Sequence, residues 1–157
     1  SVYLEDESRL VGRCALPESL RARMAESPLM ILEQPLEERI TIIREDYVEG
    51  MVADYVNRDG AEAGWLNFRD YLLSALDRIR KRLGGERHQQ LRSLMEQALA
   101  EQQASGRTEA HNAWIQALLQ DYYDPMYDYQ LSRKEGRILV RGGPETILDW
   151  ARAGSVA

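Results

Sequence analysis

The sequence has a single cysteine and no long apolar run. Cys14 cannot form a disulfide within the 157-residue chain, which favours a reducing compartment. No stretch approaches the roughly 18 apolar residues of a membrane-spanning helix. The acidic residues Glu5-Asp6-Glu7 lie where a signal peptide would be apolar. We therefore expect a cytoplasmic protein with no membrane partner.

The sequence also lacks the short motifs that usually identify an active site. It contains neither type of glycine-rich phosphate-binding loop, no Cys-x-x-Cys pair and no Ser-His-Asp signature. His88 and His111 have no metal-ligand spacing relative to Cys14. Because these motifs are absent, the sequence by itself predicts no particular catalytic reaction.

Charge is abundant, and its distribution is uneven. The net charge is −6, but seven basic and three acidic residues lie between Arg69 and Arg92, a local charge of +4. A basic face on an acidic protein is compatible with a polyanionic partner. An ordinary solvated helix face has the same composition, and cations in the last turn of a helix also favour its negative end.

Three short apolar runs predict buried strands near residues 2–5, 29–33 and 137–141. Helical patterns separate them, so the predicted fold is α/β and helix-dominated, with a small parallel sheet. Residues from about 62 to 131 are predicted to form a helical subdomain. Within it, a helix is expected to begin after Gly64. Asp124 followed by Pro125 is typical of the cap and first residue of another helix.

The end of the first predicted strand carries the best candidates for binding a phosphate or a metal ion. Asp6 follows the apolar residues at the carboxyl end, where open parallel sheets bind ligands, and could hold Mg²⁺ beside a phosphate. Arg9 could reach the same anion, and Arg39 and Arg44 follow the second strand on a helix. The alternatives are a solvated strand end and surface pairing with nearby acids such as Glu37, Glu38, Glu45 or Asp46.

Two stretches can be weighed together, Leu4-Glu5-Asp6-Glu7-Ser8-Arg9 and the tyrosine-rich Tyr122-Tyr123-Asp124-Pro125-Met126-Tyr127 with Tyr129-Gln130-Leu131. Together with the Leu16-Pro17-Glu18 turn and the helix end from Arg78 to Gly84, they resemble the C-terminal part of the bacterial tRNA 2-selenouridine synthase family. The resemblance covers essentially the whole chain. The tyrosine-rich stretch is the more specific of the two.

The resemblance implies a fragment of a larger enzyme. The family joins an N-terminal rhodanese-like domain to a P-loop domain, and this chain resembles the C-terminal half of that P-loop domain, at residues 1–157. The family converts wobble 2-thiouridine to 2-selenouridine through a geranylated intermediate, with geranyl diphosphate and selenophosphate as substrates. The rhodanese domain and the Walker A loop are absent here. We therefore expect no cofactor on the fragment and no catalysis, and either the missing half or self-association should cover exposed strand edges.

The sequence is also compatible with two other interpretations. One is a fragment of a nucleotide or small-molecule kinase, and the other is a helical RNA-binding module without catalytic activity. In the leading reading the partner is tRNA, and a basic helix end is the candidate surface that contacts it. Its residues are Arg78, Arg80, Lys81, Arg82 and Arg87.

Overall fold

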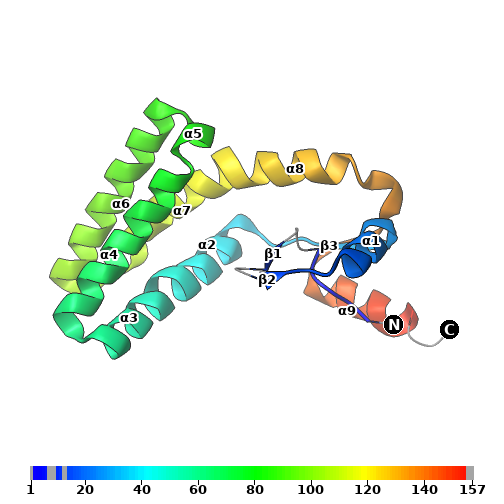
Figure 1. Cartoon of the computed structure of the whole chain (residues 1–157), viewed down its shortest axis with the longest axis horizontal. Coiled ribbons are helices and arrows are strands. Elements are labelled where there is room, and N and C mark those ends of the chain that lie inside the picture. The colour runs from blue at the N-terminus through cyan, green and yellow to red at the C-terminus, as the bar shows by residue number, and fades with distance from the viewer. Residues whose placement is uncertain (1, 7–9, 12–13, 155–157) are drawn as a thin grey trace. The chain divides into compact units, whose positions relative to one another are not determined.

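The computed structural model describes residues 2–6, 10–11 and 14–154, and Figure 1 traces its helices and strands. The chain divides into two compact units. Residues 1–34 and 130–157 form the strand unit, and residues 35–129 form the helical unit. The helical subdomain expected over residues 62–131 falls almost wholly in the second unit, which also includes the helix expected after the second strand.

The helical unit is built from long amphipathic helices joined by short turns. Its helices are α2 (Leu36–Arg44), α3 (Met51–Asp59), α4 (Ala61–Arg78), α5 (Arg80–Leu83), α6 (Gly85–Ser105), α7 (Asn112–Leu118) and most of α8 (Asp124–Ser132). A π-helical segment, η1 (Glu45–Gly50), joins α2 to α3, and a second, η3 (Leu119–Tyr123), joins α7 to α8. The short 3-10 helix η2 (Glu109–His111) precedes α7. Gly50 is the last residue of η1.

The core of the described structure lies entirely in the helical unit. All thirteen buried apolar residues fall between Ile40 and Leu119. Phe68 and Val48 have no exposed surface, and Trp114 and Ile115 are also buried. The apolar stripes that recur every three to four residues along α2, α4 and α6 supply most of this core, as amphipathic helices do.

The expectation that Gly64 precedes a helix was wrong, because α4 begins three residues earlier at Ala61. Gly60 makes the turn instead, with a φ of 86° that favours glycine. Gly64 is buried where α4 packs closely against α3. A Cβ atom at this position would lie 2.5 Å from the Tyr55 carbonyl oxygen.

α8 begins at Asp124 as expected, but Asp124 does not cap a separate helix, since α7, η3 and α8 follow one another without a break. Pro125 has no N–H to give to the carbonyl of Asp121, the usual acceptor four residues earlier. Arg87 Nη1 donates to that oxygen at 3.1 Å. The π-helical segment ends at Tyr123, two residues before Pro125, and both prolines and π-bulges are recognised causes of helix bending.

The strand unit contains two small sheets, three helical segments and no buried residue among those described. Its antiparallel pair is β1 (Leu10–Val11) with β2 (Cys14–Ala15), and its parallel pair is β3 (Leu29–Leu32) with β4 (Ile138–Gly142). Its helices are α1 (Glu18–Glu26), the 3-10 helix η4 (Glu135–Arg137) and α9 (Pro144–Gly154). The two strands expected near 29–33 and 137–141 are therefore confirmed, and they pair in parallel as expected.

The strand expected near residues 2–5 was wrong, because residues 2–6 form no strand. Val2 and Leu4 are 85% and 61% exposed, and the Tyr3 hydroxyl donates to the Ala151 carbonyl at 3.3 Å. A strand needs a neighbour that accepts and donates its backbone hydrogen bonds. No strand of the described structure lies beside these residues. An apolar pattern without a pairing partner therefore does not form a strand.

Candidate nucleic-acid interface

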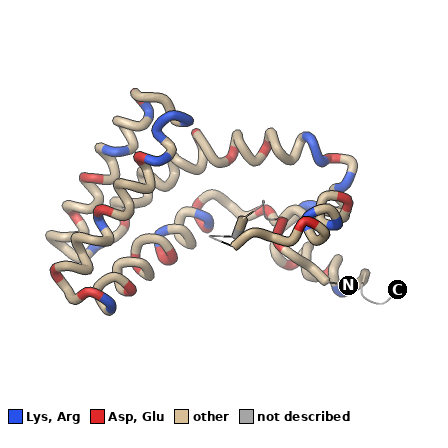
Figure 2. The backbone as a smooth tube through the Cα atoms, in the orientation of Figure 1, with Lys and Arg blue, Asp and Glu red and all other residues tan. Residues whose placement is uncertain are grey.

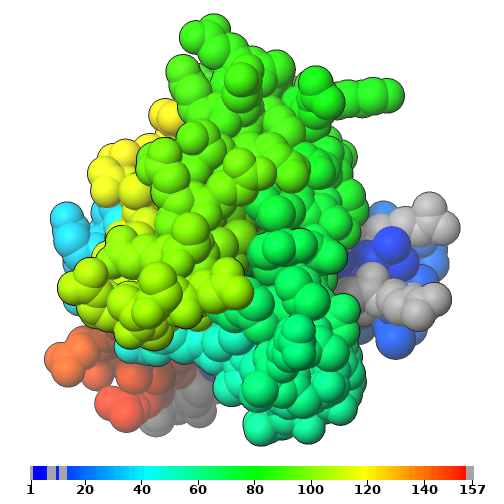
Figure 3. Space-filling model, turned by 90° about the vertical axis from the view of Figure 1, so that its left-hand side faces the viewer, coloured from blue at the N-terminus to red at the C-terminus, as the bar shows by residue number. Residues whose placement is uncertain are grey.

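The basic residues expected to contact RNA gather at one end of the helical unit, here called the basic corner. They are Arg78, Arg80, Lys81, Arg82 and Arg87. In Figure 2 the Lys and Arg positions cluster where the chain passes from α4 through α5 to α6. In Figure 3 this green segment projects at the top of the face that α4 and α6 form.

The corner is made by two breaks in the helical path. Ile79, with φ −97° and ψ 4°, ends α4, and Gly84, with φ 83°, ends the single turn of α5. Leu83 is buried between them and anchors the turn in the core. The cations of α5 therefore point outward while its one leucine points inward. An open hollow at the start of α6 is lined by Leu83, Gly84, Gly85, Glu86, Arg87 and Gln90.

Within the described structure, Arg87 is the one cation of the five that lies within 4.0 Å of a carboxylate, and the other four have no carboxylate partner. The Arg78 guanidinium lies 5.9 Å from the centre of the Tyr71 ring, and Arg82 Nη1 donates to the Tyr122 hydroxyl at 3.4 Å. This hydrogen bond raises the pKa of Arg82. Arg87 Nε lies 4.0 Å from a carboxylate oxygen of Asp121. Arg80 and Lys81 are exposed and have no ion-pair partner within the described ranges.

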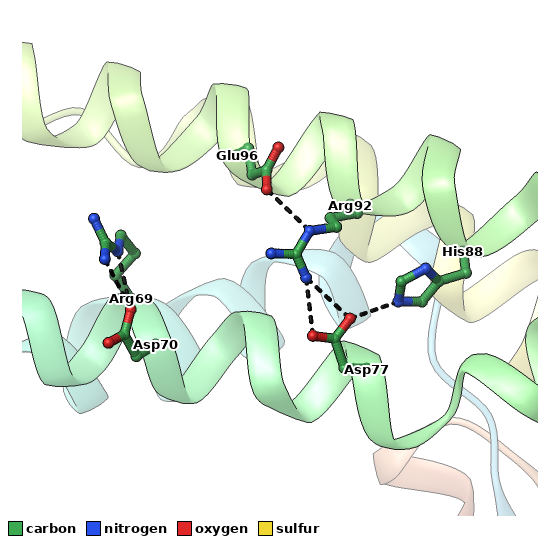
Figure 4. Close-up of polar contacts among 6 residues, drawn as sticks. All are labelled: Arg69, Asp70, Asp77, His88, Arg92 and Glu96. Atoms are coloured by element: carbon green, nitrogen blue, oxygen red, sulfur yellow. Dashed lines mark hydrogen bonds and ion pairs between the residues drawn. The ribbon is translucent and has the colours of Figure 1, made fainter. Parts of the chain in front are cut away.

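A polar network behind the corner joins α4 to α6 (Figure 4). Asp77 accepts hydrogen bonds from His88 Nε2 at 2.8 Å and from Arg92 Nη1 at 2.9 Å. Arg92 Nε also donates to Glu96 at 3.0 Å. Desolvation opposes ionisation of Asp77, but the hydrogen bonds from Arg92 and His88 outweigh it and lower the pKa of Asp77. The network therefore fixes α6 against α4 on both sides of the turn.

Sequence reasoning missed this network and could have found only part of it. Arg92 and Glu96 are four residues apart on one helix, a spacing that predicts an ion pair. Asp77 lies 11 residues from His88 and 15 from Arg92, across the turn. No local pattern predicts contacts of that range.

The residues expected to bind phosphate have protein partners. In the strand unit, Asp6 accepts a hydrogen bond from Lys134 Nζ at 2.5 Å. In the helical unit, Arg39 binds both carboxylate oxygens of Asp124, at 2.5 and 3.2 Å. Arg9 lies outside the described residues. The partner of Arg39 is therefore a distant aspartate and not one of the neighbouring acids on its own helix.

Arg44 also lies against the other helices of its unit. Its Nη1 donates to Asn112 Oδ1 at 3.1 Å, and its Nε lies 3.3 Å from Glu49 Oε1. Its side chain is 18% exposed. Both arginines of α2 therefore bridge to the α7–α8 run, and an incoming phosphate would have to displace Asp124 or Asn112.

A magnesium site is not assembled by the described residues. Among them, no three His, Cys, Asp or Glu side chains come together as a metal site would require. Asp6 has an ammonium group as its partner.

The tyrosine-rich stretch lies on η3 and α8. The Tyr122 and Tyr123 rings meet edge to face at 4.9 Å, and Tyr123 and Tyr127 stack at 6.4 Å. Burial raises the pKa of Tyr123, with smaller contributions from the neighbouring tyrosines. Tyr127 and Tyr129 are 53% and 65% exposed. The segment therefore packs inward at Tyr123 and presents aromatic surface further along α8.

No helix in the described part of the chain is long and apolar enough to cross a membrane.

Comparison with known proteins assigns the chain to a family. A family model described as "tRNA 2-selenouridine synthase AAA domain" matches residues 1–156. The chain is 74% identical over 152 residues to the tRNA 2-selenouridine synthase of Marinobacter nauticus, covering 97% of this chain and 41% of that protein. It is 50% identical over 142 residues to that of Alcanivorax borkumensis, covering 90% and 39%. For Bordetella petrii the identity is 49% over 149 residues, covering 95% and 40%.

No solved structure matched the chain. The chain spans about two fifths of the length of these curated relatives. With a match over almost every residue, the chain belongs to the tRNA 2-selenouridine synthase AAA-domain family.

Proposed function

We propose that this chain is the RNA-contacting part of a tRNA 2-selenouridine synthase and that the basic corner binds the tRNA backbone. The observation that carries the proposal is that four cations of the corner have no carboxylate partner among the described residues, namely Arg78, Arg80, Lys81 and Arg82. The relatives' name says that those proteins act on tRNA. A polyanion is the partner that such a surface on an otherwise acidic chain would favour.

The geometry of the corner suits a phosphate backbone better than a small ligand. Arg80 and Lys81 project from a single turn whose only buried side chain is Leu83. Cations that are already solvated and unpaired can bind phosphate without first breaking an ion pair. Behind them, the Asp77 network holds the start of α6 in place, which positions Arg87 beside the same surface.

The chemistry of the whole protein is a further part of the proposal. By resemblance, a transferase converts wobble 2-thiouridine to 2-selenouridine through a geranylated intermediate, using geranyl diphosphate and selenophosphate. In that enzyme Asp6, Arg9, Arg39 and Arg44 are the candidate contacts to the diphosphate. A P-loop half outside this chain would supply the phosphate loop, and this chain alone would be inactive. The proposed compartment is the cytoplasm, where tRNA is modified.

The RNA-binding proposal is tested by tRNA affinity as a function of salt. The double variant Arg80→Ala, Lys81→Ala should bind unmodified tRNA roughly tenfold more weakly at about 0.1 M salt. The slope of log affinity against log salt should fall by about one for each phosphate that the variant no longer neutralises. Fluorescence anisotropy with labelled tRNA measures both quantities on the chain and its variants.

Arg107→Ala is the matched control. Arg107 is an exposed arginine that follows the far end of α6 and pairs with Glu101 at 2.9 Å. Its removal should leave both affinity and salt slope unchanged. Wild-type binding and an unchanged slope in the double variant would overturn the proposal. Mass analysis of tRNA nucleosides from cells carrying the full-length variants then shows whether geranylation and selenation depend on the corner.

A further inference from the structure

We infer that the basic corner continues into a base-stacking platform, in which the exposed ring of Tyr127, with Tyr123 and Tyr47 beside it, binds an unpaired nucleotide of the RNA. This inference rests on the proposed function, because it adds a base contact to a surface that is proposed to bind the RNA backbone. A base inside a duplex offers no free face to a side chain, so the nucleotide bound here is an unpaired one.

Two arginines of the basic corner connect it directly to the tyrosine-rich stretch. Arg82 Nη1 donates to the Tyr122 hydroxyl at 3.4 Å, and Arg87 Nη1 donates to the Asp121 carbonyl at 3.1 Å. Both acceptors belong to η3, which continues into α8 (Figure 1). All four residues lie in the helical unit. The cations and the first of the rings are therefore neighbours on that unit.

The rings follow one another along η3 and α8. Tyr122 meets Tyr123 edge to face at 4.9 Å between ring centres, and Tyr123 stacks with Tyr127 at 6.4 Å. Tyr123 and Tyr127 are four residues apart, a spacing that places side chains on one face of a helix. Tyr47, on η1, lies near enough to Tyr123 to contribute to its raised pKa. Two separate segments of the chain therefore bring their tyrosines to one place.

Core packing accounts for the position of Tyr123 but not for the exposure of its neighbours. Tyr123 is half-buried and packs against the hydrophobic core. Tyr127 and Tyr47 are 53% and 54% exposed. Proteins that bind single-stranded nucleic acid combine cations with aromatic side chains on which bases stack. The exposed surface of these two tyrosines, next to the corner, has that combination.

The acidic residues around the rings do not oppose an RNA ligand. Asp124 is bound by two nitrogens of Arg39, and Asp121 lies 4.0 Å from Arg87 Nε. One further acid adjoins each exposed ring in the sequence, and adjacent residues of a helix do not face each other. The local charge is therefore set by the unpaired cations of the corner, which favour a phosphate backbone.

The open position of the rings favours a nucleotide over a small apolar ligand. Small molecules usually bind in pockets that bury most of their surface. Tyr127 and Tyr47 instead leave more than half of their surface to solvent. A nucleotide within a longer strand needs only one ring face for its base, because its neighbouring phosphates are bound elsewhere on the protein.

Anisotropy titrations with two labelled RNAs test this inference, a single strand of about ten nucleotides and a duplex of the same sequence. Tyr127→Ala should weaken binding of the single strand about tenfold and leave binding of the duplex unchanged. The slope of log affinity against log salt should stay the same, because no phosphate contact is lost. Tyr127→Phe retains the ring and should bind both RNAs as the wild type does.

Tyr129→Ala is the matched control. Tyr129 is an exposed tyrosine two residues further along α8, and therefore on a different face of that helix. Its removal should leave the binding of both RNAs unchanged. The inference is overturned if Tyr127→Ala binds the single strand normally, loses as much affinity for the duplex, or is matched by Tyr129→Ala. A Tyr127→Phe variant as weak as Tyr127→Ala also overturns it.

A second readout detects the stacking itself. 2-Aminopurine within the single strand loses fluorescence when it stacks on an aromatic ring. The saturated wild-type complex should quench it, and the saturated Tyr127→Ala complex should not; equal quenching contradicts the inference. Failure of the proposed function has a different signature, an unchanged salt slope in the Arg80→Ala, Lys81→Ala variant, whatever the result at Tyr127.

Discussion

His111 is held in one tautomer by two side chains of the helical core. Trp114 Nε1–H donates to His111 Nδ1 at 2.9 Å, so the proton of the neutral ring lies on Nε2. Nε2 lies 2.9 Å from Gln102 Oε1, which accepts that proton. Burial lowers the pKa of His111 to about 4. Protonation would place a second N–H against the indole donor, so the folded state requires the neutral ring.

Folding stability should therefore fall as the pH falls below the ordinary histidine pKa. The unfolded chain binds the proton at about pH 6.5, whereas folded His111 resists it until about pH 4. The contribution of His111 is fully present above about pH 6.5 and is lost progressively below it. By about pH 5 the loss should be about 2 kcal/mol. Urea unfolding of the chain between about pH 7 and pH 5 measures it.

His111→Gln removes the titrating group and should flatten this pH dependence, whatever its cost at neutral pH. His88 is the only other histidine, so His88→Gln is the control and should keep the loss. Asp59, whose pKa is lowered to about 2 by hydrogen bonds from Arg58 and Asn67, loses its contribution only at lower pH. An equal pH dependence in His111→Gln would show that other groups cause it.

The sequence could identify the cations of the candidate site but not the partners of the other charged residues. Arg80 and Lys81 were recognisable because they stand in a local run of like charge. The partner of Arg39 is Asp124, 85 residues away, and Asp6 and Lys134 are 128 residues apart. Such pairs depend on how helices pack, which composition and local spacing do not determine.

At the scale of elements, most helices follow from periodicity, while their joints do not. Residues that disfavour helix stand at the ends of α1, α5 and α6, namely Ser27-Pro28, Gly84-Gly85 and Ser105-Gly106. The joint expected at Gly64 was misplaced, and the one expected at Asp124-Pro125 is a boundary without a break. Glycine and proline usually mark helix breaks. Here Gly64 lies inside α4, where its small size allows close packing against α3, and Pro125 lies in a helical path that continues from the π-helical segment η3.

The α3–α4 contact depends on the missing side chain of Gly64. A Cβ atom there would lie 2.5 Å from the Tyr55 carbonyl oxygen and 2.6 Å from Val56 Cα, both backbone atoms that cannot rotate away. Gly64→Ala gains about 1 kcal/mol of helix propensity. Separating two packed helices costs more, and overpacking typically costs about 1–3 kcal/mol. We expect a net loss of up to about 2 kcal/mol in the free energy of unfolding, measured by urea titration.

Gly85→Ala is the matched control for this substitution. Gly85 is the first residue of α6, and a Cβ atom there would meet nothing within 4 Å. The same chemical change should therefore be neutral or slightly stabilising. A Gly64→Ala variant as stable as Gly85→Ala would show that α3 and α4 can separate at little cost.

For the whole molecule, the sequence predicts the class of fold better than it predicts which unit contains the buried apolar core. The parallel pairing of two apolar runs, with a long helical segment between them, was predictable from their composition. The first apolar run, near residues 2–5, does not form a strand, because three apolar residues do not specify a pairing partner. Nothing local shows that all buried apolar residues among those described belong to the helical unit. That distribution emerges only from packing.

A chain with its core in one unit should unfold in two steps. The strand unit buries little apolar surface and should open first, whereas the helical unit keeps its core. Trp150 reports the strand unit, because the fluorescence difference between the chain and Trp150→Phe isolates its signal in α9. Its midpoint in urea should lie roughly 1 M or more below that of Trp65, isolated in the same way with Trp65→Phe on α4. Coincident transitions would mean that the two units unfold together and that the strand unit draws its stability from the helices.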